Sequence, residues 1–245
     1  IAMTMIVSAH LGDSILIATD KRAIVCDLET GSMHISNDDE QKIKLWNRGA
    51  IAGTGETLFL NRIADYFIQF DKDGRSFKQM DAIYQEMERR LEEGVPKEVL
   101  INNTIIFSIF NGTETLLYSI PMEAFFDVTH RNGIEMIYPY MHEIKAWTVD
   151  VTCFNLPPDM SNLQNFQRHL KGLCDFEDEK SFIEYYIAQL KLVFMKQAEI
   201  DPSITPSFDL YIQSCRTGQS LALHVPNLVL SSPISENLNF WDRNR

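Results

Sequence analysis

Two short apolar runs near the start of the chain predict a β-hairpin. The runs are Met5–Ala9 and Ile15–Ala18, and between them lies the pair Gly12-Asp13, which is typical of tight turns between strands. Thr4 stands at the outer end of the first run, and Asp20 follows the second. Because the two strands of a hairpin are antiparallel, we expect the turn to bring Asp20 back beside Thr4.

The rest of the chain predicts strands that alternate with pairs of helices. Residues 27–40 are rich in Gly, Ser, Asn and Asp and predict an exposed loop. Because each element must bury one face, the order of strands, two helices, strands, two helices and strands predicts an α+β fold, with two sheets face to face and a helix pair outside each. The expected strands are 42–46, 50–53, 103–110, 115–120, 143–151, 207–214 and 219–225. The first expected helix is opened by residues 53–56 and runs to residue 68, and the others cover 76–93, 162–173 and 179–196.

The length is that of one large folded domain. The chain has 245 residues and a mass of 28.2 kDa, which is enough for one substantial core. We expect a single domain over 4–225, preceded by residues 1–3 and followed by an extension, 226–245.

Charge, hydropathy and cysteine spacing exclude several classes of partner. The net charge of −12 argues against a nucleic-acid surface, which needs clustered Lys and Arg. No apolar run approaches the ~20 residues of a membrane span, and the N-terminus lacks the pattern of a signal peptide. The cysteines at positions 26, 153, 174 and 215 are too widely spaced for a zinc site or a disulfide framework. We therefore expect a cytoplasmic protein with no metal, cofactor, nucleic-acid or membrane partner.

Four features near the start of the chain together resemble the proteasome β-subunit family. They are Thr4, the run Ala18–Arg22 (Ala-Thr-Asp-Lys-Arg), Lys42 at the start of a later strand, and Ile51–Gly55 before a helix. Each feature is weak alone, but the four in this order and at this spacing are specific. The family includes the bacterial HslV peptidase and belongs to the N-terminal nucleophile (Ntn) hydrolases. The resemblance is clear over residues 4–75 and looser beyond them.

The resemblance implies a four-layer αββα sandwich and a hydrolase whose nucleophile is the hydroxyl of Thr4. In such an enzyme the α-amine of a terminal threonine, with an ordinary pKa of about 7.7–8.0, acts as the base. A positive Lys42 would lower the pKa of both groups, Asp20 would orient Lys42, and Arg22 would brace Asp20. The backbone N–H of Gly53 would supply the oxyanion hole.

Two further positions follow from the same resemblance. Ile51, two residues before the oxyanion glycine, corresponds to the base of the substrate pocket and implies a weak preference for apolar acyl-side residues. Asp201 corresponds to a supporting carboxylate of the catalytic site. The family has a serine three residues after this carboxylate, but the residue there in this chain is Ile204. Ser203 or Thr205 is left to take the place of that serine.

Two hypotheses of function remain open from the sequence. The family has a Gly-Ser-Gly turn whose serine supports the terminal amine, and this turn is missing from residues 147–158, which indicates a divergent bacterial relative. In addition, residues 1–3 precede Thr4, so its amine is not free in the sequence given. The first hypothesis is a proteasome-type threonine peptidase or amidohydrolase, in which Met3 is removed as an initiator methionine or as the end of a propeptide. The second is a catalytically silent scaffold or binding subunit, which the missing turn and the three residues ahead of Thr4 favour.

The last expectation concerns how copies of the chain assemble with one another. The resemblance implies a peptide or amide substrate and a homo-oligomer in the form of a ring or stack, and it allows an ATPase partner. We expect residues 226–233 to add an edge strand. The Phe240-Trp241 pair then either folds back onto the chain's own helices or docks on a neighbouring subunit, where aromatic residues are favoured anchors.

Overall fold

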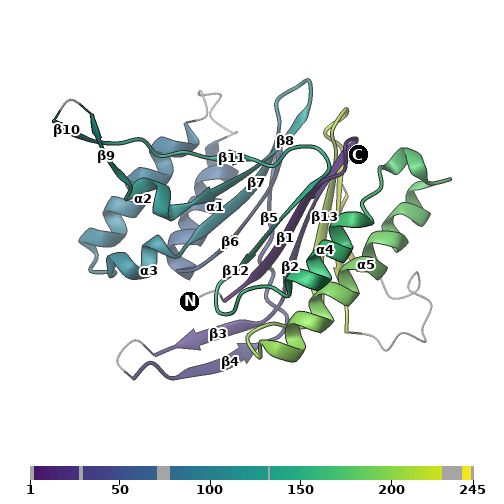
Figure 1. Cartoon of the computed structure of the whole chain (residues 1–245), viewed down its shortest axis with the longest axis horizontal. Coiled ribbons are helices and arrows are strands. Elements are labelled where there is room, and N and C mark those ends of the chain that lie inside the picture. The colour runs from purple at the N-terminus through teal and green to yellow at the C-terminus, as the bar shows by residue number, and fades with distance from the viewer. Residues whose placement is uncertain (1–2, 28–29, 71–77, 132, 228–238, 244–245) are drawn as a thin grey trace.

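Two antiparallel sheets form the body of the molecule (Figure 1). The computed structural model describes residues 3–27, 30–70, 78–131, 133–227 and 239–243. Within these ranges the strands form a six-stranded sheet, a five-stranded sheet and two separate two-stranded ribbons. No helix within them is long and apolar enough to cross a bilayer.

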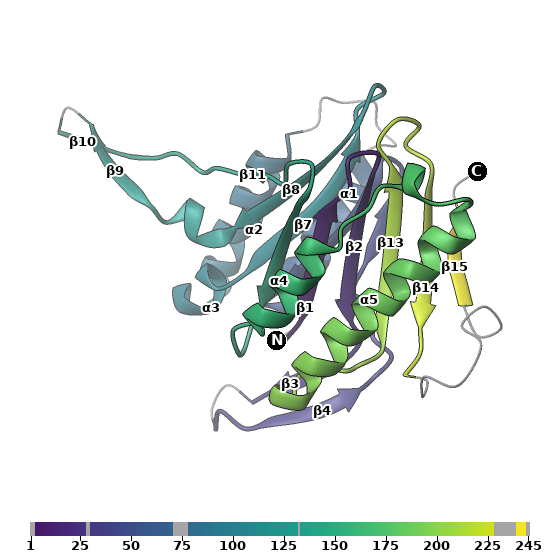
Figure 2. The ribbon, with the colours of Figure 1, turned by 45° about the vertical axis from the view of Figure 1, so that its right-hand side comes forward.

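The six-stranded sheet brings the start of the chain against its end. Its strand order is β12-β1-β2-β13-β14-β15, so the N-terminal hairpin pairs directly with the strand that follows the last helix. Helices α4 and α5 cover its outer face, where a large apolar cluster is buried (Figure 2). The elements are β1 (Met5–His10), β2 (Ser14–Asp20), β12 (Thr148–Cys153), β13 (Phe208–Ser214), β14 (Ser220–Val225), β15 (Asn239–Arg243), α4 (Met160–Arg168) and α5 (Glu179–Ile200).

The five-stranded sheet is built from the middle of the chain. Its strand order is β11-β8-β7-β6-β5, and α1 and α2 pack on its outer face around a second apolar cluster. The elements are β5 (Lys44–Trp46), β6 (Gly49–Thr54), β7 (Thr104–Phe110), β8 (Thr115–Pro121), β11 (His142–Glu143), α1 (Thr57–Phe70), α2 (Gln79–Glu92), the short helix α3 (Lys97–Ile101) and a 3₁₀ turn at Met122–Phe125.

A third apolar cluster lies between the two sheets. It takes Ile17 and Tyr211 from the six-stranded sheet and Ala50, Ile106 and Leu117 from the five-stranded sheet. Strands β2 and β6 are buried at every position because one face meets the other sheet and the opposite face meets helices. The helices need only one apolar face, which explains their helical periodicity in the sequence. The mixed α and β content predicted from the sequence is confirmed.

The described part of residues 27–40 is exposed almost throughout, as predicted, but the prediction of a loop is wrong at 33–37, which form a strand. Strands β3 (Ala23–Cys26) and β4 (Met33–Asn37) pair there as a ribbon that extends from the body of the molecule (Figure 1). Every residue of β4 is exposed, so burial imposes no alternation of apolar and polar residues on it. A second ribbon, β9 (Val128–Arg131) and β10 (Ile134–Ile137), projects from another part of the molecule and was not predicted (Figure 2).

The strand expected at 143–151 is divided between the two sheets. β11 pairs with β8, and β12, which begins at Thr148, pairs with β1. Between them Trp147 adopts a φ of 65°, and its N–H donates to the carbonyl of His10 at 2.7 Å. A positive φ in a bulky residue reverses the chain sharply, which ends one strand and starts the next in the other sheet. The helix expected at 162–173 also ends earlier, at Arg168.

The tail returns to the six-stranded sheet. β15 pairs with β14, with a register break between Ala222 and Leu223. The edge strand expected within 226–233 falls outside the described residues from position 228 onward. The expected contacts of the Phe240 and Trp241 side chains lie outside the described part of the chain as well.

Candidate functional site

The N-terminal hairpin places Thr4 and Asp20 at the same end of the six-stranded sheet. In the β1–β2 register Met5 falls opposite Asp20, and the Met5 N–H donates to Asp20 Oδ1 at 3.0 Å. Thr4 and Asp20 are both fully buried. The turn therefore brings together the two residues that the sequence pattern placed side by side.

A buried ion pair joins this end of the hairpin to the chain just before β5. The Lys42 Nζ donates to Asp20 Oδ1 at 2.9 Å and to the carbonyl oxygen of Met3 at 3.1 Å. The two charged side chains are 4% and 0% exposed, respectively. The ammonium of Lys42 thus lies directly beside the peptide bond that joins Met3 to Thr4.

Burial has opposite effects on the two members of this pair. It raises the pKa of the Asp20 carboxyl and lowers the pKa of the Lys42 ammonium, because loss of hydration disfavours the charged form of each. Their mutual attraction opposes both shifts, and the N–H donors around Asp20 also oppose the rise in the pKa of Asp20. A desolvated pair is costly to the fold unless it is well hydrogen-bonded, and strongly perturbed ionisable groups concentrate at functional sites.

Arg22 supports Asp20 through its backbone and not through its side chain. The Arg22 N–H donates to Asp20 Oδ2 at 2.9 Å. The guanidinium instead makes two hydrogen bonds to Asp38, at 2.7 and 2.9 Å, and a third to the carbonyl of Pro202. The guanidinium does not contact Asp20, because Asp20 already accepts from the N–H groups of Met5 and Arg22 and from Lys42, and Asp38 offers a bidentate partner.

Gly53 lies in β6, at the wall of a cavity of about 300 Å³ that Lys42 and Ile51 also line. A Cβ at position 53 would lie 2.4 Å from the Cδ2 atom of Leu60 in α1. A side chain here would displace Leu60 and crowd the carbonyl oxygen of Thr104 at 3.2 Å, so glycine allows the closest packing of the strand at this point. The structure thus brings Lys42, Gly53 and Ile51 together around one cavity, and Lys42 connects the cavity to Thr4.

The cavity is lined by both apolar and polar residues. They come from β6, α1 and β7 and from the β3–β4 ribbon and the segment that follows it. The apolar lining residues are Ala23, Ile24, Val25, Ile51, Ala52, Leu60, Ile63, Ala64 and Ile105, and the polar ones include Ser36, Asn37, Glu40, Gln41, Lys44, Thr57 and Asn61.

Asp201 is a second buried carboxylate, and Ser203 is its partner. Asp201 Oδ1 accepts from the Ser203 hydroxyl at 2.6 Å, from the Ser203 N–H at 2.9 Å and from Asn155 Nδ2 at 3.2 Å. Thr205, the other proposed substitute, instead accepts from the N–H of Lys21 at 3.0 Å. Asp201 Oδ2 is buried without a hydrogen-bond partner among the described residues.

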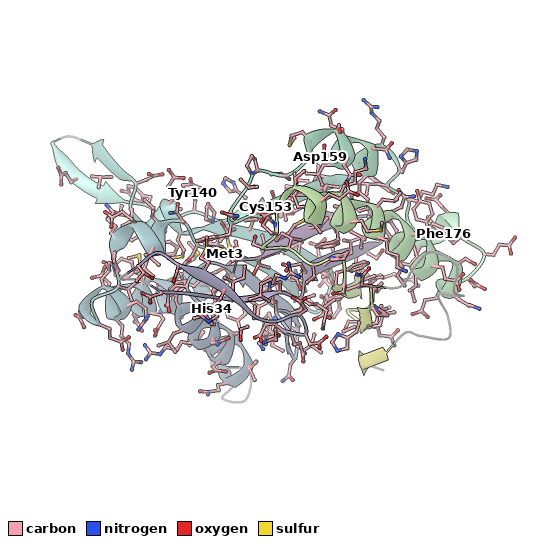
Figure 3. The ribbon with its side chains drawn as sticks, turned by 90° about the horizontal axis from the view of Figure 1, so that it is seen from below. Met3, His34, Tyr140, Cys153, Asp159 and Phe176 are labelled. Atoms are coloured by element: carbon pink, nitrogen blue, oxygen red, sulfur yellow. The ribbon has the colours of Figure 1, made fainter. Side chains whose placement is uncertain are left out.

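Asn155 is the site residue that the sequence reasoning missed. It lies in the bend after β12, within the segment where the Gly-Ser-Gly turn was sought. Because β12 pairs with β1 so that Cys153 lies opposite Met5, this bend falls at the Thr4 end of the sheet. Met3 and Cys153 lie near each other in Figure 3. An amide side chain directly after the strand that pairs with β1 was the available signal.

The thiol of Cys153 is not a competing nucleophile. Burial raises its pKa to about 12, and the nearby carboxylates of Asp201 and Asp20 act in the same direction. A thiol with such a pKa is almost entirely protonated at neutral pH and therefore unreactive.

Comparison with known proteins identifies the fold. No protein-family model and no curated protein matches the sequence. Among solved structures, the chain is similar to Anbu (ancestral beta-subunit) from Yersinia bercovieri, with a TM-score of 0.57 and 11% identity over 87% of this chain and 83% of that one. It is also similar to Anbu in the helical assembly of the Anbu complex from Pseudomonas aeruginosa, with a TM-score of 0.59 and 13% identity over 92% and 88% of the two chains.

A third similar structure is a complex with an inhibitor. Thiobacillus denitrificans BPH in complex with epoxomicin gives a TM-score of 0.53 and 12% identity over 86% of this chain and 98% of that one. At these identities the likeness concerns the fold alone. The fold of the chain is proteasome-like.

Proposed function

We propose that the chain is a proteasome-type N-terminal threonine hydrolase that acts on peptides or related amides. The observation that carries the proposal is the buried Lys42–Asp20 pair, whose ammonium lies 3.1 Å from the carbonyl oxygen of Met3, immediately before Thr4. The proteasome-like fold supports the same assignment. We infer the four-layer αββα architecture of that family from the helices outside the two packed sheets.

In this mechanism Thr4 is the nucleophile once its α-amine is free. The amine takes the hydroxyl proton, and the Thr4 Oγ attacks the carbonyl carbon of the substrate to give a tetrahedral intermediate. The N–H of Gly53 donates to the oxyanion; removal of such a donor typically costs about 2.7–4 kcal/mol. The C–N bond then breaks as the leaving amine takes the proton, and water hydrolyses the acyl ester formed on Thr4.

Lys42 and Asp20 set the protonation state of the nucleophile in this proposal. The positive charge of Lys42 favours the neutral amine of Thr4, and the effect is strong because the pair is shielded from solvent. Asp20 holds the ammonium in place through the 2.9 Å hydrogen bond. Burial lowers the pKa of Lys42, and the adjacent Asp20 carboxylate opposes this shift and so favours the charged ammonium.

Asp201 supports the released amine. Its Oδ1 is saturated by Ser203 and Asn155, and its Oδ2 is a buried acceptor without a donor among the described residues. A buried carboxylate oxygen without a donor is costly. The α-amino group of Thr4, once freed from Met3, is the donor that we assign to it.

The proposal is tested first at the N-terminus of the mature protein. In the sequence given, the nitrogen of Thr4 is part of a peptide bond to Met3, so an aminopeptidase or an internal cleavage must release it. The intact mass of untagged protein should match a chain that starts at Thr4. An epoxyketone such as epoxomicin should then modify that residue. A protein that retains Met3 in cells would overturn the enzymatic function.

The substrate preference follows from the cavity beside Gly53. Ile51 and Ile63 are part of its apolar lining, so we propose a preference for apolar side chains on the acyl side of the cleaved bond. Hydrolysis of a matched set of fluorogenic peptide amides measures this preference. Faster cleavage after acidic or basic residues would contradict it.

A second candidate function is a catalytically silent scaffold or binding subunit. It is favoured by the hydrogen bond between Lys42 and the Met3 carbonyl, because an unprocessed chain would keep that ammonium occupied. The mass measurement separates the two functions. In either case we propose a homo-oligomer, such as a ring or stack, since one similar structure is described as a helical assembly; light scattering measures its size. An ATPase partner and a cytoplasmic location stay predictions from the sequence.

A further inference from the structure

The segment that leads from Gly53 into α1 is held by a buried asparagine, Asn103. Asn103 lies between α3 and β7 and is 1% exposed. Its Oδ1 accepts from the N–H of Glu56 at 2.8 Å. Its own backbone is fixed on both sides, since its N–H donates to Leu100 O at 3.0 Å and its carbonyl accepts from the Met122 N–H at 2.9 Å. The amide is therefore rigidly placed relative to the sheet.

Gly55 and Asn103 interlock. Gly55 has a φ of 130°, a conformation open essentially to glycine alone. A Cβ at position 55 would lie 1.4 Å from Asn103 Oδ1. The asparagine oxygen thus occupies the space that a side chain at position 55 would need, so glycine at this position accommodates Asn103.

Glu56 fixes the other end of the same segment. Its carboxylate accepts from the N–H groups of Leu58 at 3.1 Å and Phe59 at 2.8 Å, which caps the start of α1. The same carboxylate accepts from Arg90 Nε at 3.0 Å, which ties it to α2. Residues 53–56 are therefore held by α2 at one side and by Asn103 at the other.

The second half of the Asn103 amide is unsatisfied. Its Nδ2 is buried and has no hydrogen-bond partner among the described residues. A buried donor without a partner is unfavourable, and such groups in native structures call for an explanation beyond stability. The same position of the amide places Asn103 Oδ1 where it accepts from the Glu56 N–H and packs against Gly55.

We infer that Asn103 is a positioning residue for the oxyanion hole. Its Oδ1 fixes the Gly55–Glu56 turn and thereby holds Gly53, two residues earlier, in its place at the wall of the cavity. The inference rests on the proposed function for the role of Gly53, whereas the mechanical claim that Asn103 holds the turn does not.

The test compares substitutions at two adjacent asparagines. Asn103→Ala removes the acceptor, and Asn103→Asp keeps an acceptor oxygen at the same place. Asn102→Ala is the matched control, because Asn102 is exposed and its Nδ2 donates to Glu98 O within α3. The readouts are kcat and KM for a peptide amide and hydrogen exchange of the Gly55 and Glu56 amides. Asn103→Ser is the second variant if Asn103→Ala does not fold.

For Asn103→Ala we expect kcat to fall about tenfold or more with KM within about twofold, because displacement of an oxyanion donor affects the transition state and not binding. Exchange at positions 55 and 56 should accelerate. Asn103→Asp should recover most of kcat, and Asn102→Ala should change neither readout. An unchanged kcat in a folded Asn103→Ala protein would overturn the inference while leaving the hydrolase intact.

The proposed hydrolase activity and the mechanical role of Asn103 can be rejected independently of each other. If the mature wild-type protein has no hydrolase activity, the proposed function fails, and hydrogen exchange alone decides the mechanical claim. Faster exchange at residues 55 and 56 in Asn103→Ala, and not in Asn102→Ala, would then support it. Equal exchange in the wild-type protein and the Asn103→Ala variant would reject it.

Discussion

The two ends of the β1–β2 hairpin each hold a carboxylate that accepts two backbone N–H groups, but they treat its charge differently. At the turn, Asp13 accepts from the N–H groups of Leu173 and Cys174, both at 3.0 Å, and from the Ser14 hydroxyl. Although partial burial opposes the shift, these donors lower the pKa of Asp13. This end attaches the segment after α4 to the hairpin.

At the open end, Asp20 accepts from the N–H groups of Met5 and Arg22 and also from the Lys42 ammonium, yet burial raises its pKa. The hydrogen-bond donors are at least as good as those of Asp13, so the depth of burial decides the difference. One end uses a carboxylate to join two segments. The other holds a desolvated ion pair beside Thr4, which is an arrangement suited to chemistry.

The largest expected effect comes from removing the chemical groups at the open end. Thr4→Ala should abolish turnover and epoxyketone labelling, and Lys42→Ala should reduce kcat at least about 10³-fold, while both proteins stay folded by circular dichroism. Lys145→Ala is the control, because Lys145 is an exposed lysine whose partner is Glu143. Unchanged hydrolysis in Thr4→Ala or Lys42→Ala would reject the mechanism.

The next effect separates the two carboxylates by stability. Asp20→Asn leaves the Lys42 ammonium buried without its counter-charge, which should lower the free energy of unfolding by about 3–5 kcal/mol. Asp13→Asn weakens only a partly exposed, cap-like set of hydrogen bonds and should cost about 1 kcal/mol. Urea denaturation measures both values. Equal losses at the two positions would show that burial does not distinguish the two ends.

Smaller effects are expected from two amide side chains, Asn155 and Gln167, that form hydrogen bonds near opposite ends of β12. Asn155 donates to Asp201 at the open end, and Gln167 accepts from the Val149 N–H at 2.9 Å near the turn end. Asn155→Ala removes one hydrogen bond to a charged group and should lower kcat about tenfold. Gln167→Ala should change the free energy of unfolding and leave kcat unaltered. Similar kcat losses in both variants would assign Asn155 a merely structural role.

The smallest effect is a pH dependence at the turn end. Because the folded-state pKa of Asp13 is depressed below its ordinary value of 3.8, its ionised form stabilises the fold above that value. This contribution should disappear as the pH falls through the folded-state pKa. The difference in unfolding free energy between wild type and Asp13→Asn, measured in urea at about pH 5 and about pH 3, should therefore shrink at the lower pH. A constant difference would contradict the assignment.

The site could be predicted from the sequence where it depends on local geometry. The hairpin turn alone sets Asp20 beside Met5, so their neighbourhood followed from strand pattern and turn residues. Lys42 and Gly53 followed from motif spacing. The partner of the Arg22 side chain could not be predicted, because its choice between Asp20 and Asp38 depends on how many donors already surround Asp20 in the folded chain.

The missed residues act through contacts that no local pattern encodes. Asn155 bonds to Asp201 across 46 residues, and Asn103 bonds to Glu56 across 47. The fold class was predictable because buried strands and helices carry strong periodicity. The β3–β4 ribbon was not, because every position of β4 is exposed and burial leaves no signature in its sequence.

The pairing of β2 with β13 has a consequence for how the protein is made. Lys21 and Asp209, which bond across this pairing at 3.0 Å, are 188 residues apart, whereas β5 to β8 of the other sheet lie within 44–121. On a ribosome the middle sheet has its strands early, while β2 keeps an open edge until the last helix has emerged. Long-range pairings of this kind form slowly and leave strand edges exposed to aggregation. The six-stranded sheet next to Thr4 is therefore completed after the five-stranded one, so the surroundings of Thr4 stay unfinished until β13 has been synthesised.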